Sequence, residues 1–302
     1  MTADTGRFLT ATGQFLSAEP VRNSVMLTVT ENLRVKTAAR SPAEPPAAEP
    51  SAAEPDATPG EPLFGWWQAN PEPVGAAFMH TPDFPVMLSL MSGSAAAELA
   101  RALAAAGRRV RGVNASQDAA DAFAAAWRDR TGDAAAVHRR MRLFRLGELV
   151  WPAPGPEGTA RPAAGTDRDL LAGWFDAFTR EVGDPHRQDH RAAVDERLGY
   201  GGLTVWEAGG VPVSIAGLTR AVAGMVRVGP VYTPPELRGR GYAAAATAAV
   251  SQAALDAGVR EVVLYTDLAN PTSNALYQRL GYRPVEDRVV LSFEPVVRDG
   301  GR

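Results

Sequence analysis

Apolar residues in the first 40 positions recur at the spacing of amphipathic helices. Phe8, Phe15 and Leu16 share one face, and Glu19-Pro20 interrupts the pattern, so the segment from Thr5 to about Arg40 predicts two helices. The residues that follow, 41–62 (SPAEPPAAEPSAAEPDATPGEP), are rich in Pro, Ala and Glu. Such a stretch cannot bury apolar surface, so we expect a disordered loop there.

The rest of the chain alternates short apolar runs with longer helical periods. After the loop, the pattern predicts three strands, a helix, a strand, a helix and a strand, at residues 63–68, 74–79, 86–91, 94–106, 109–113, 116–130 and 137–146. Residues 151–166, WPAPGPEGTARPAAGT, are rich in Pro and Gly and are typical of an interdomain linker. Beyond them the pattern predicts two helices, three strands, a helix, a strand, a helix and a strand, at 167–180, 188–198, 203–207, 213–220, 225–232, 241–257, 261–267, 272–280 and 288–293.

The same order of elements therefore occurs twice, which suggests a duplicated domain. A length of 302 residues agrees with this, since domains usually have ~100–200 residues. We expect an α/β (α+β) fold with one domain at 1–150, a linker at 151–166 and a second domain at 167–302.

Composition and charge exclude several kinds of site. The chain has no cysteine, which excludes disulfides, cysteine-bound metals and a thiol nucleophile. Lys36 is its only lysine, so the P-loop motif is absent, and a net charge of −3 argues against nucleic-acid binding. The sequence has no apolar run of about 18 residues, and its first residues lack the basic start and apolar core of a signal peptide. We therefore expect no membrane partner and a cytoplasmic location.

The segment 228–243, VGPVYTPPELRGRGYA, carries the clearest chemical signal. A β-branched strand leads through two prolines into Arg238-Gly239-Arg240-Gly241 and then directly into an alanine-rich helix. Glycines at a helix start let the backbone approach a ligand closely, and the free N–H groups there suit a phosphate. Arginines add charge-assisted donors. The segment therefore predicts an anion site, with a pyrophosphate as the expected anion.

Gly229-Pro230 lies inside the preceding strand. Proline cannot donate to a strand ladder, so the strand should bulge or part from its neighbour at this point. Backbone groups left unpaired need partners, which an amide-bearing ligand lying alongside would supply. Coenzyme A meets both demands, because it has a pyrophosphate at one end and two pantetheine amides beyond it.

Two motifs in this half resemble those of a known family. Arg238-x-x-Gly241-x-Ala243 resembles the R-x-x-G-x-G/A motif of the GNAT superfamily of N-acetyltransferases, and 231–235 (VYTPP) resembles its strand exit. Downstream, 270–282 (NPTSNALYQRLGY) resembles the second signature, an asparagine-containing turn followed by a tyrosine and Gly-Tyr at the helix end. The resemblance implies that each domain is a mixed, mostly antiparallel sheet flanked by helices.

The resemblance also implies roles for residues. The pyrophosphate of acetyl-CoA would lie on Arg238, Gly239, Arg240, Gly241, Tyr242 and Ala243, and the backbone of Val231, Tyr232 and Thr233 would hold pantetheine and the acetyl carbonyl. Asn270 would touch the pantetheine arm. For Asn274, a helix-capping or turn role is at least as well supported as contact with the ligand. Tyr277 would act as the general acid beside the sulfur, with a packing role as its alternative, and Tyr282 is expected in the core.

The chain departs from the family in its carboxylates and histidines. No carboxylate lies in Met225–Tyr232, and Glu207, Asp184 and Asp267 are only distant candidates for a base. We therefore expect direct attack of the amine on the thioester, favoured by positioning and carbonyl polarisation. His186 and His190 are spaced i, i+4, but the glutamate of H-E-x-x-H is missing, so we expect a polar loop and no metal.

The N-terminal half lacks the first motif and has Met91-Ser-Gly-Ser-Ala95 in its place, which predicts a degenerate GNAT-like half without cofactor binding. The expected function is transfer of an acetyl group from acetyl-CoA to a primary amine of a small molecule. A protein N-terminus is the alternative acceptor, and a non-catalytic CoA-binding sensor or scaffold is the alternative class. Gly239-x-Gly241-x-x-Ala244 also fits a dinucleotide fingerprint, but the acidic residue does not fall where that fingerprint needs it. The pattern carries no signal for an oligomeric state.

Overall fold

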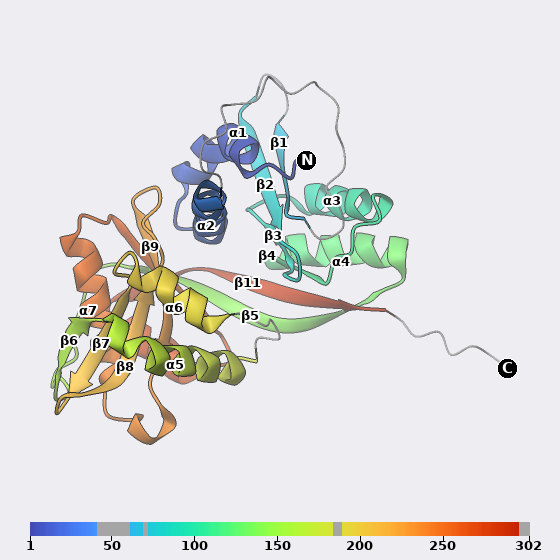
Figure 1. Cartoon of the computed structure of the whole chain (residues 1–302). Helices are drawn as coiled ribbons and strands as arrows, with labels where there is room; N and C mark the ends of the chain where they lie inside the picture. The colour runs from blue at the N-terminus through green and yellow to red at the C-terminus, as the bar shows by residue number, and fades with distance from the viewer. Residues whose placement is uncertain (41–60, 69–71, 184–188, 296–302) are drawn as a thin grey trace. The chain divides into compact units, whose positions relative to one another are not determined.

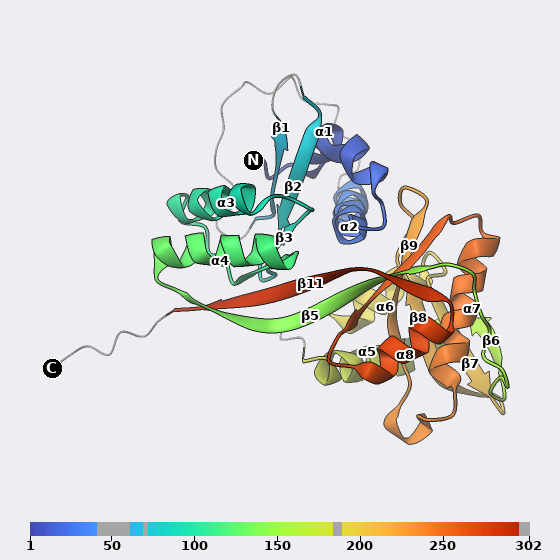
Figure 2. The same cartoon turned by 180° about the vertical axis from the view of Figure 1, so that it is seen from behind.

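The computed structural model describes residues 1–40, 61–68, 72–183 and 189–295 (Figures 1 and 2). The loop expected at 41–62 lies almost entirely outside the described residues. The chain divides into two compact units: unit 1 is Met1–Arg142 together with the chain from Glu286 onward, and unit 2 is Leu143–Val285. Each is described by itself. None of the described helices is long and apolar enough to cross a membrane.

Unit 1 begins with the two predicted helices and continues as a sheet covered by two more. Its elements are α1 (Thr5–Ala18), α2 (Ser24–Arg40), β1 (Leu63–Gln68), β2 (Val74–His80), β3 (Val86–Leu88), α3 (Gly93–Ala105), β4 (Gly112–Ala115), α4 (Gln117–Thr131) and the first part of β5 (Ala134–Leu146). The strand order is β1-β2-β3-β4-β11-β5, where only β3 and β4 are a parallel pair among the pairs with a defined register. Phe123, Trp127 and Phe293 stack with ring centroids 5.7–6.3 Å apart, which packs α4 on this sheet.

Unit 2 carries the second set of elements. These are β6 (Thr159–Pro162), the short 3-10 turn η1 (Gly165–Asp167), α5 (Arg168–Glu181), α6 (His190–Leu198), β7 (Leu203–Ala208), β8 (Val211–Leu218), β9 (Met225–Tyr232), η2 (Pro235–Leu237), α7 (Tyr242–Asp256), β10 (Glu261–Asp267), α8 (Pro271–Arg279) and the start of β11 (Tyr282–Glu294). The strand order is β5-β10-β9-β8-β7-β6, in which β9 and β10 are parallel and β6 to β9 antiparallel.

Helices cover both faces of the unit 2 sheet. On one face, α5 and α6 enclose a core that includes Phe175, Ile215 and Tyr232. On the other face, the alanine-rich α7 packs its small side chains against Val226 and Val228. Figure 1 shows α5 and α6 in front of this sheet, and Figure 2 shows α8 from behind. The small side chains let α7 lie close to the strands, which brings its N-terminus to the end of β9.

The fold class and the order of elements are as predicted, and β9 and β10 have the predicted bounds. The expected linker, however, contains the strand β6, which pairs antiparallel with β7 from Thr159↔Glu207 to Pro162↔Thr204. The compact units also differ from the expected domains 1–150 and 167–302, because β5 and β11 are each 13 residues long and continue from one unit into the other. The proposed duplication stays a prediction.

Candidate active site

Strands β9 and β10 pair only at their first residues. The register joins Met225 to Glu261, Val226 to Val262 and Arg227 to Val263, and no pair follows. On its other side, β9 has a bulge against β8, where Leu218 pairs with Val228 and Ala216 with Val231. Gly229-Pro230 lies inside that bulge, as the proline predicted. The two parallel strands therefore part at the centre of unit 2.

The loop after β9 leads into a helix N-terminus without a side-chain cap. Gly239 and Gly241 have φ of 74° and 84°, a left-handed conformation that glycine adopts without steric cost. Gly241 is the N-cap of α7 and supplies no side-chain hydrogen bond. By contrast, Ser92 caps α3 and Asn270 caps α8. The first N–H groups of α7 thus point from the helix end without a side-chain acceptor, which is the arrangement that binds phosphate oxygens.

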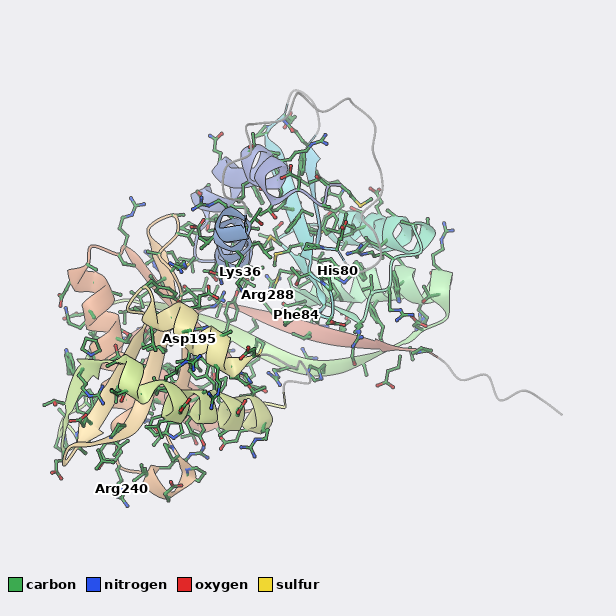
Figure 3. All side chains as sticks on the ribbon, viewed as in Figure 1. Lys36, His80, Phe84, Asp195, Arg240 and Arg288 are labelled. Atoms are coloured by element: carbon green, nitrogen blue, oxygen red, sulfur yellow. The ribbon has the colours of Figure 1, made fainter. Side chains whose placement is uncertain are left out.

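The two arginines of the loop have different surroundings. Arg238 Nε donates to the carbonyl of Thr233 at 2.9 Å, and its Nη2 donates to both carboxylate oxygens of Glu181 at 2.7 Å. Its guanidinium also lies 5.8 Å from the ring centre of Tyr232. Arg238 therefore fixes the exit of β9 against α5. Arg240 has only a long bond of 3.4 Å to the Glu236 carbonyl, and Figure 3 shows it at the periphery of unit 2.

Residues 231–233 are held by β8. Ser214 Oγ donates to the carbonyl of Tyr232 at 3.0 Å and lies 2.8 Å from the hydroxyl of Thr233. Tyr232 is buried in the core under α5 and α6, and burial raises the pKa of its hydroxyl. The side chain of Val231 packs on the opposite face, against the α7 core. These bonds hold the strand end in place, which is what a backbone contact to a ligand would require.

Tyr277 lies on α8 and belongs to the edge of the α7 core. Its ring centre is 6.5 Å from that of Phe144 and 6.0 Å from that of Tyr282. The side chain is partly exposed, and within the described residues its hydroxyl has no hydrogen-bond partner. Burial raises the pKa of Tyr277 to about 12, so its hydroxyl remains a proton donor at neutral pH. Tyr282 is fully buried and hydrogen-bonds to Ser251 at 2.7 Å, which confirms its predicted place in the core.

The two asparagines of the second motif hold the turn between β10 and α8. Asn270 Oδ1 accepts from the Ser273 amide at 3.0 Å. Asn274 Nδ2 donates to the carbonyls of Asp267 and Asn270, each at 2.8 Å, while its Oδ1 is buried without a partner. Each side chain therefore bonds to the backbone of the turn through one of its amide atoms, which is what a capping or turn role requires, while ligand contact of Asn270 and Asn274 stays a prediction.

Glu207, Asp267 and His190, the described candidates for a base or a metal ligand, each contact another group of the protein. Glu207 accepts from Arg161 Nε at 2.6 Å, and Asp267 accepts from the Ala269 amide at 2.8 Å. His190 Nε2 lies 3.3 Å from Asp176, whereas Asp184 and His186 fall outside the described residues. Among the residues that the structure describes, no group of three or more His, Asp or Glu side chains could hold a metal ion.

Sequence reasoning missed a group of three arginines near the paired end of β9. Arg197, Arg220 and Arg227 surround Tyr200, and each has a buried guanidinium nitrogen without a hydrogen bond. One signal was available, because Arg227 interrupts the otherwise uncharged strand MVRVGPVY. The other two arginines come from α6 and from the β8–β9 connection, so only the fold brings them together.

Unit 1 contains a parallel pair of its own, but a side chain of the protein bridges it. Val86 and Met87 of β3 pair with Val113 and Asn114 of β4. Arg288 on β11, labelled in Figure 3, donates to the carbonyls of Leu88 at 2.6 Å and Asn114 at 3.0 Å. It is only 6% exposed. The ends of β3 and β4 are thus joined by a guanidinium.

Comparison with known proteins agrees with the motifs. Residues 168–282 match the family model described as the acetyltransferase (GNAT) family. No curated protein that was compared matches the chain in sequence.

Solved structures share the fold at low identity. A GNAT-family acetyltransferase from Colwellia psychrerythraea is 12% identical, with a TM-score of 0.52 over 76% of this chain and 84% of that one. A GCN5-related N-acetyltransferase from Sphaerobacter thermophilus is 19% identical, with a TM-score of 0.52 over 75% and 78%. A Drosophila protein is 14% identical, with a TM-score of 0.64 over 97% of both chains. Residues 168–282 thus match the GNAT acetyltransferase family model in sequence, and the solved structures share the fold.

Proposed function

We propose that this protein transfers an acetyl group from acetyl-CoA directly to a primary amine of a small molecule. The observation that carries the proposal is the parting of β9 from β10 beside the uncapped start of α7. The first feature ends the backbone pairing of the two strands, so an extended amide chain could pair there, and the second offers N–H groups to a pyrophosphate. Coenzyme A has both parts, and acetyl-CoA supplies an activated thioester when it is bound.

The residues of unit 2 fit such a ligand. The left-handed Gly239 and Gly241 turn the backbone of the loop so that it can approach phosphate oxygens, and Arg240 lies exposed beside them. Arg238 is better described as a positioning residue, since its guanidinium is bound to Glu181 and the Thr233 carbonyl. Its role is to fix the strand end that flanks the opening.

Tyr277 is proposed to donate a proton to the leaving sulfur. Its hydroxyl has no partner among the described residues, and a pKa of about 12 keeps it protonated at neutral pH. A positioned donor of this kind accelerates a reaction by ~10²–10⁴-fold. The chain has no cysteine, so an acyl-cysteine intermediate is excluded. The neutral amine attacks the thioester carbonyl directly, the C–S bond breaks as the sulfur takes the Tyr277 proton, and the proton lost by the nitrogen passes through water to restore the tyrosine.

We propose further that only unit 2 binds the cofactor. In unit 1, Arg288 occupies the carbonyls of Leu88 and Asn114, and Ser92 caps the helix that corresponds in order to α7. Both features that favour coenzyme A in unit 2 are therefore replaced by contacts within the protein. This supports the prediction of a degenerate N-terminal half.

Thermal unfolding with acetyl-CoA, CoA and NADH tests the cofactor. A ligand that binds only the folded protein stabilises it by about 2.7 kcal/mol at 100 times its Kd. We expect both CoA species to raise the midpoint and NADH to leave it unchanged. CoA release from acetyl-CoA in the presence of a panel of amines then tests the transfer. No shift with either CoA species would refute the proposal.

A further inference from the structure

Three arginines of unit 2 converge on one tyrosine. The guanidinium of Arg220 lies 4.3 Å from the ring centre of Tyr200, and the Tyr200 hydroxyl donates to the Leu218 carbonyl at 2.9 Å. Arg197 and Arg227 both lie within electrostatic range of the same hydroxyl. Because α6, the β8–β9 connection and β9 each supply one arginine, the positive charge is concentrated by the fold.

These guanidinium groups are only partly hydrogen-bonded within the protein. Arg197 Nη1 donates to the Ala193 carbonyl at 3.2 Å, and the Arg197 guanidinium lies 5.4 Å from the ring centre of Phe175. Arg197 Nε, Arg220 Nε and Arg227 Nη1 are buried and have no hydrogen bond. Within the described residues, no carboxylate forms an ion pair with any of the three.

Burial lowers the pKa of Arg227, Tyr265 acts in the opposite direction, and the charge of Arg197 lowers this pKa further. The three side chains are partly exposed, and the Glu196 carboxylate also lies within electrostatic range of Tyr200. The buried, unpaired guanidinium nitrogens are donors that an anionic ligand would satisfy.

The position of Arg227 connects this cluster to the candidate active site. Arg227 and Val263 form the last pair of β9 and β10 before the strands part. Its neighbours Val226 and Val228 face the α7 core, so Arg227 faces the side covered by α5 and α6. The phosphate-binding turn leads instead into α7, which covers the opposite face. The cluster therefore lies on the side of the opening that remains for the acceptor.

We propose that the acceptor amine carries an anionic group, a carboxylate or a phosphate, which Arg197, Arg220 and Arg227 bind. This inference rests on the proposed acetyl transfer and narrows its substrate class. The three guanidiniums hold the anionic end, which places the amine of a short acceptor at the point where β9 and β10 part. A neutral amine of the same length lacks this anchor.

Matched pairs of acceptors test the inference. Acetyl transfer from acetyl-CoA is measured with β-alanine against propylamine, and with phosphoethanolamine against ethanolamine, which also distinguishes carboxylate from phosphate. The variants are Arg227→Met and, as a control, Arg191→Met, which removes an exposed arginine of the same helix as Arg197. We expect Arg227→Met to raise KM for the preferred anionic acceptor by about 10- to 100-fold. KM for acetyl-CoA should stay unchanged in both variants.

The outcomes separate this inference from the proposed function. If acetyl-CoA stabilises the protein but neutral amines react as well as their anionic counterparts, the inference is refuted and acetyl transfer stands. If acetyl-CoA does not bind, the proposed function itself fails. If no amine of the panel reacts, thermal unfolding with propionate and with inorganic phosphate at constant ionic strength decides. A shift in the wild type that Arg227→Met abolishes supports the anion site, and no shift refutes it.

Discussion

The two ends of α7 allow a matched test of the phosphate site. Gly241 precedes the helix with φ of 84°, and Gly258 follows it with φ of 80°. A Cβ added at Gly241 would meet Pro156 no closer than 3.6 Å, and one at Gly258 would meet nothing within 4 Å. Gly241→Ala and Gly258→Ala therefore introduce the same backbone strain without a steric clash, but only the first alters the proposed site.

The expected cost to stability follows from the conformation. An L-residue in the left-handed region costs ~1–2 kcal/mol, which lowers the melting temperature of a domain of this size by roughly 2–8 °C. We expect a similar loss in both variants. Relaxation of Gly241→Ala also turns N–H groups away from the phosphate, and each charge-assisted hydrogen bond that is lost is worth ~1.5–3 kcal/mol. The Kd for CoA should therefore rise by about 10- to 100-fold in Gly241→Ala alone.

Isothermal titration with CoA, together with unfolding curves without ligand, measures both quantities. The reasoning fails if Gly241→Ala binds CoA within about threefold of the wild type while it loses stability. It fails equally if Gly258→Ala loses binding to the same extent, because backbone strain would then explain both effects.

Four further predictions concern single residues. Tyr277→Phe should lower kcat by about 10²-fold or more and leave the affinity for CoA unchanged. In the wild type, the pKa of the Tyr277 hydroxyl is raised to about 12, so its loss of a proton should cause no decline in rate between pH 7 and 10. Burial and the charge of Arg108 lower the pKa of His80 to about 4, below the unfolded value of about 6.5, so the unfolded state takes up the proton first. Stability should fall by about 3 kcal/mol between pH 7 and pH 4, and denaturant unfolding of His80→Gln should lack this loss. Arg288→Met should lower the free energy of unfolding by about 3 kcal/mol, because the carbonyls of Leu88 and Asn114 lose their donor. Since only unit 2 is proposed to bind the cofactor, calorimetry should find one CoA per wild-type chain. Arg227→Met should raise the melting temperature, since it removes a buried guanidinium nitrogen that has no hydrogen bond; a marked drop would mean that the arginine has a structural role instead.

Local sequence signals account for most of the elements of unit 2. Gly and Pro mark both ends of β9 and α7, and β-branched residues fill β10, so their bounds could be predicted closely. The bulge at Gly229-Pro230 was also predictable, because proline lacks the N–H that the ladder needs. Strand β6 was missed because a four-residue edge strand in a Pro/Gly-rich stretch is defined only by its pairing with β7.

Side-chain roles depended on contacts between distant residues. The motif suggested that Arg238 reaches a phosphate, which stays a prediction, and no local pattern indicates that its Nη2 also binds Glu181, 57 positions away in the chain. The cluster of Arg197, Arg220 and Arg227 likewise joins two elements and a connection that no local pattern associates. Asn270 and Asn274 could be assigned to a turn, since asparagine commonly bonds to nearby backbone groups. Burial and long-range ion pairs are the features that a single sequence does not encode locally.

The long strands β5 and β11 make each unit depend on residues of strands that continue into it from the other unit. Phe144, at the end of β5, belongs to unit 2 and lies against Tyr277, the proposed acid. In return, β11 places Val289, Leu291 and Phe293 in the core of unit 1. A gene shortened to encode residues 151–302 would lose the support of Tyr277 and would expose an apolar strand that favours aggregation. If the proposed transfer depends on Tyr277, selection for it would also preserve the strands that join the two units.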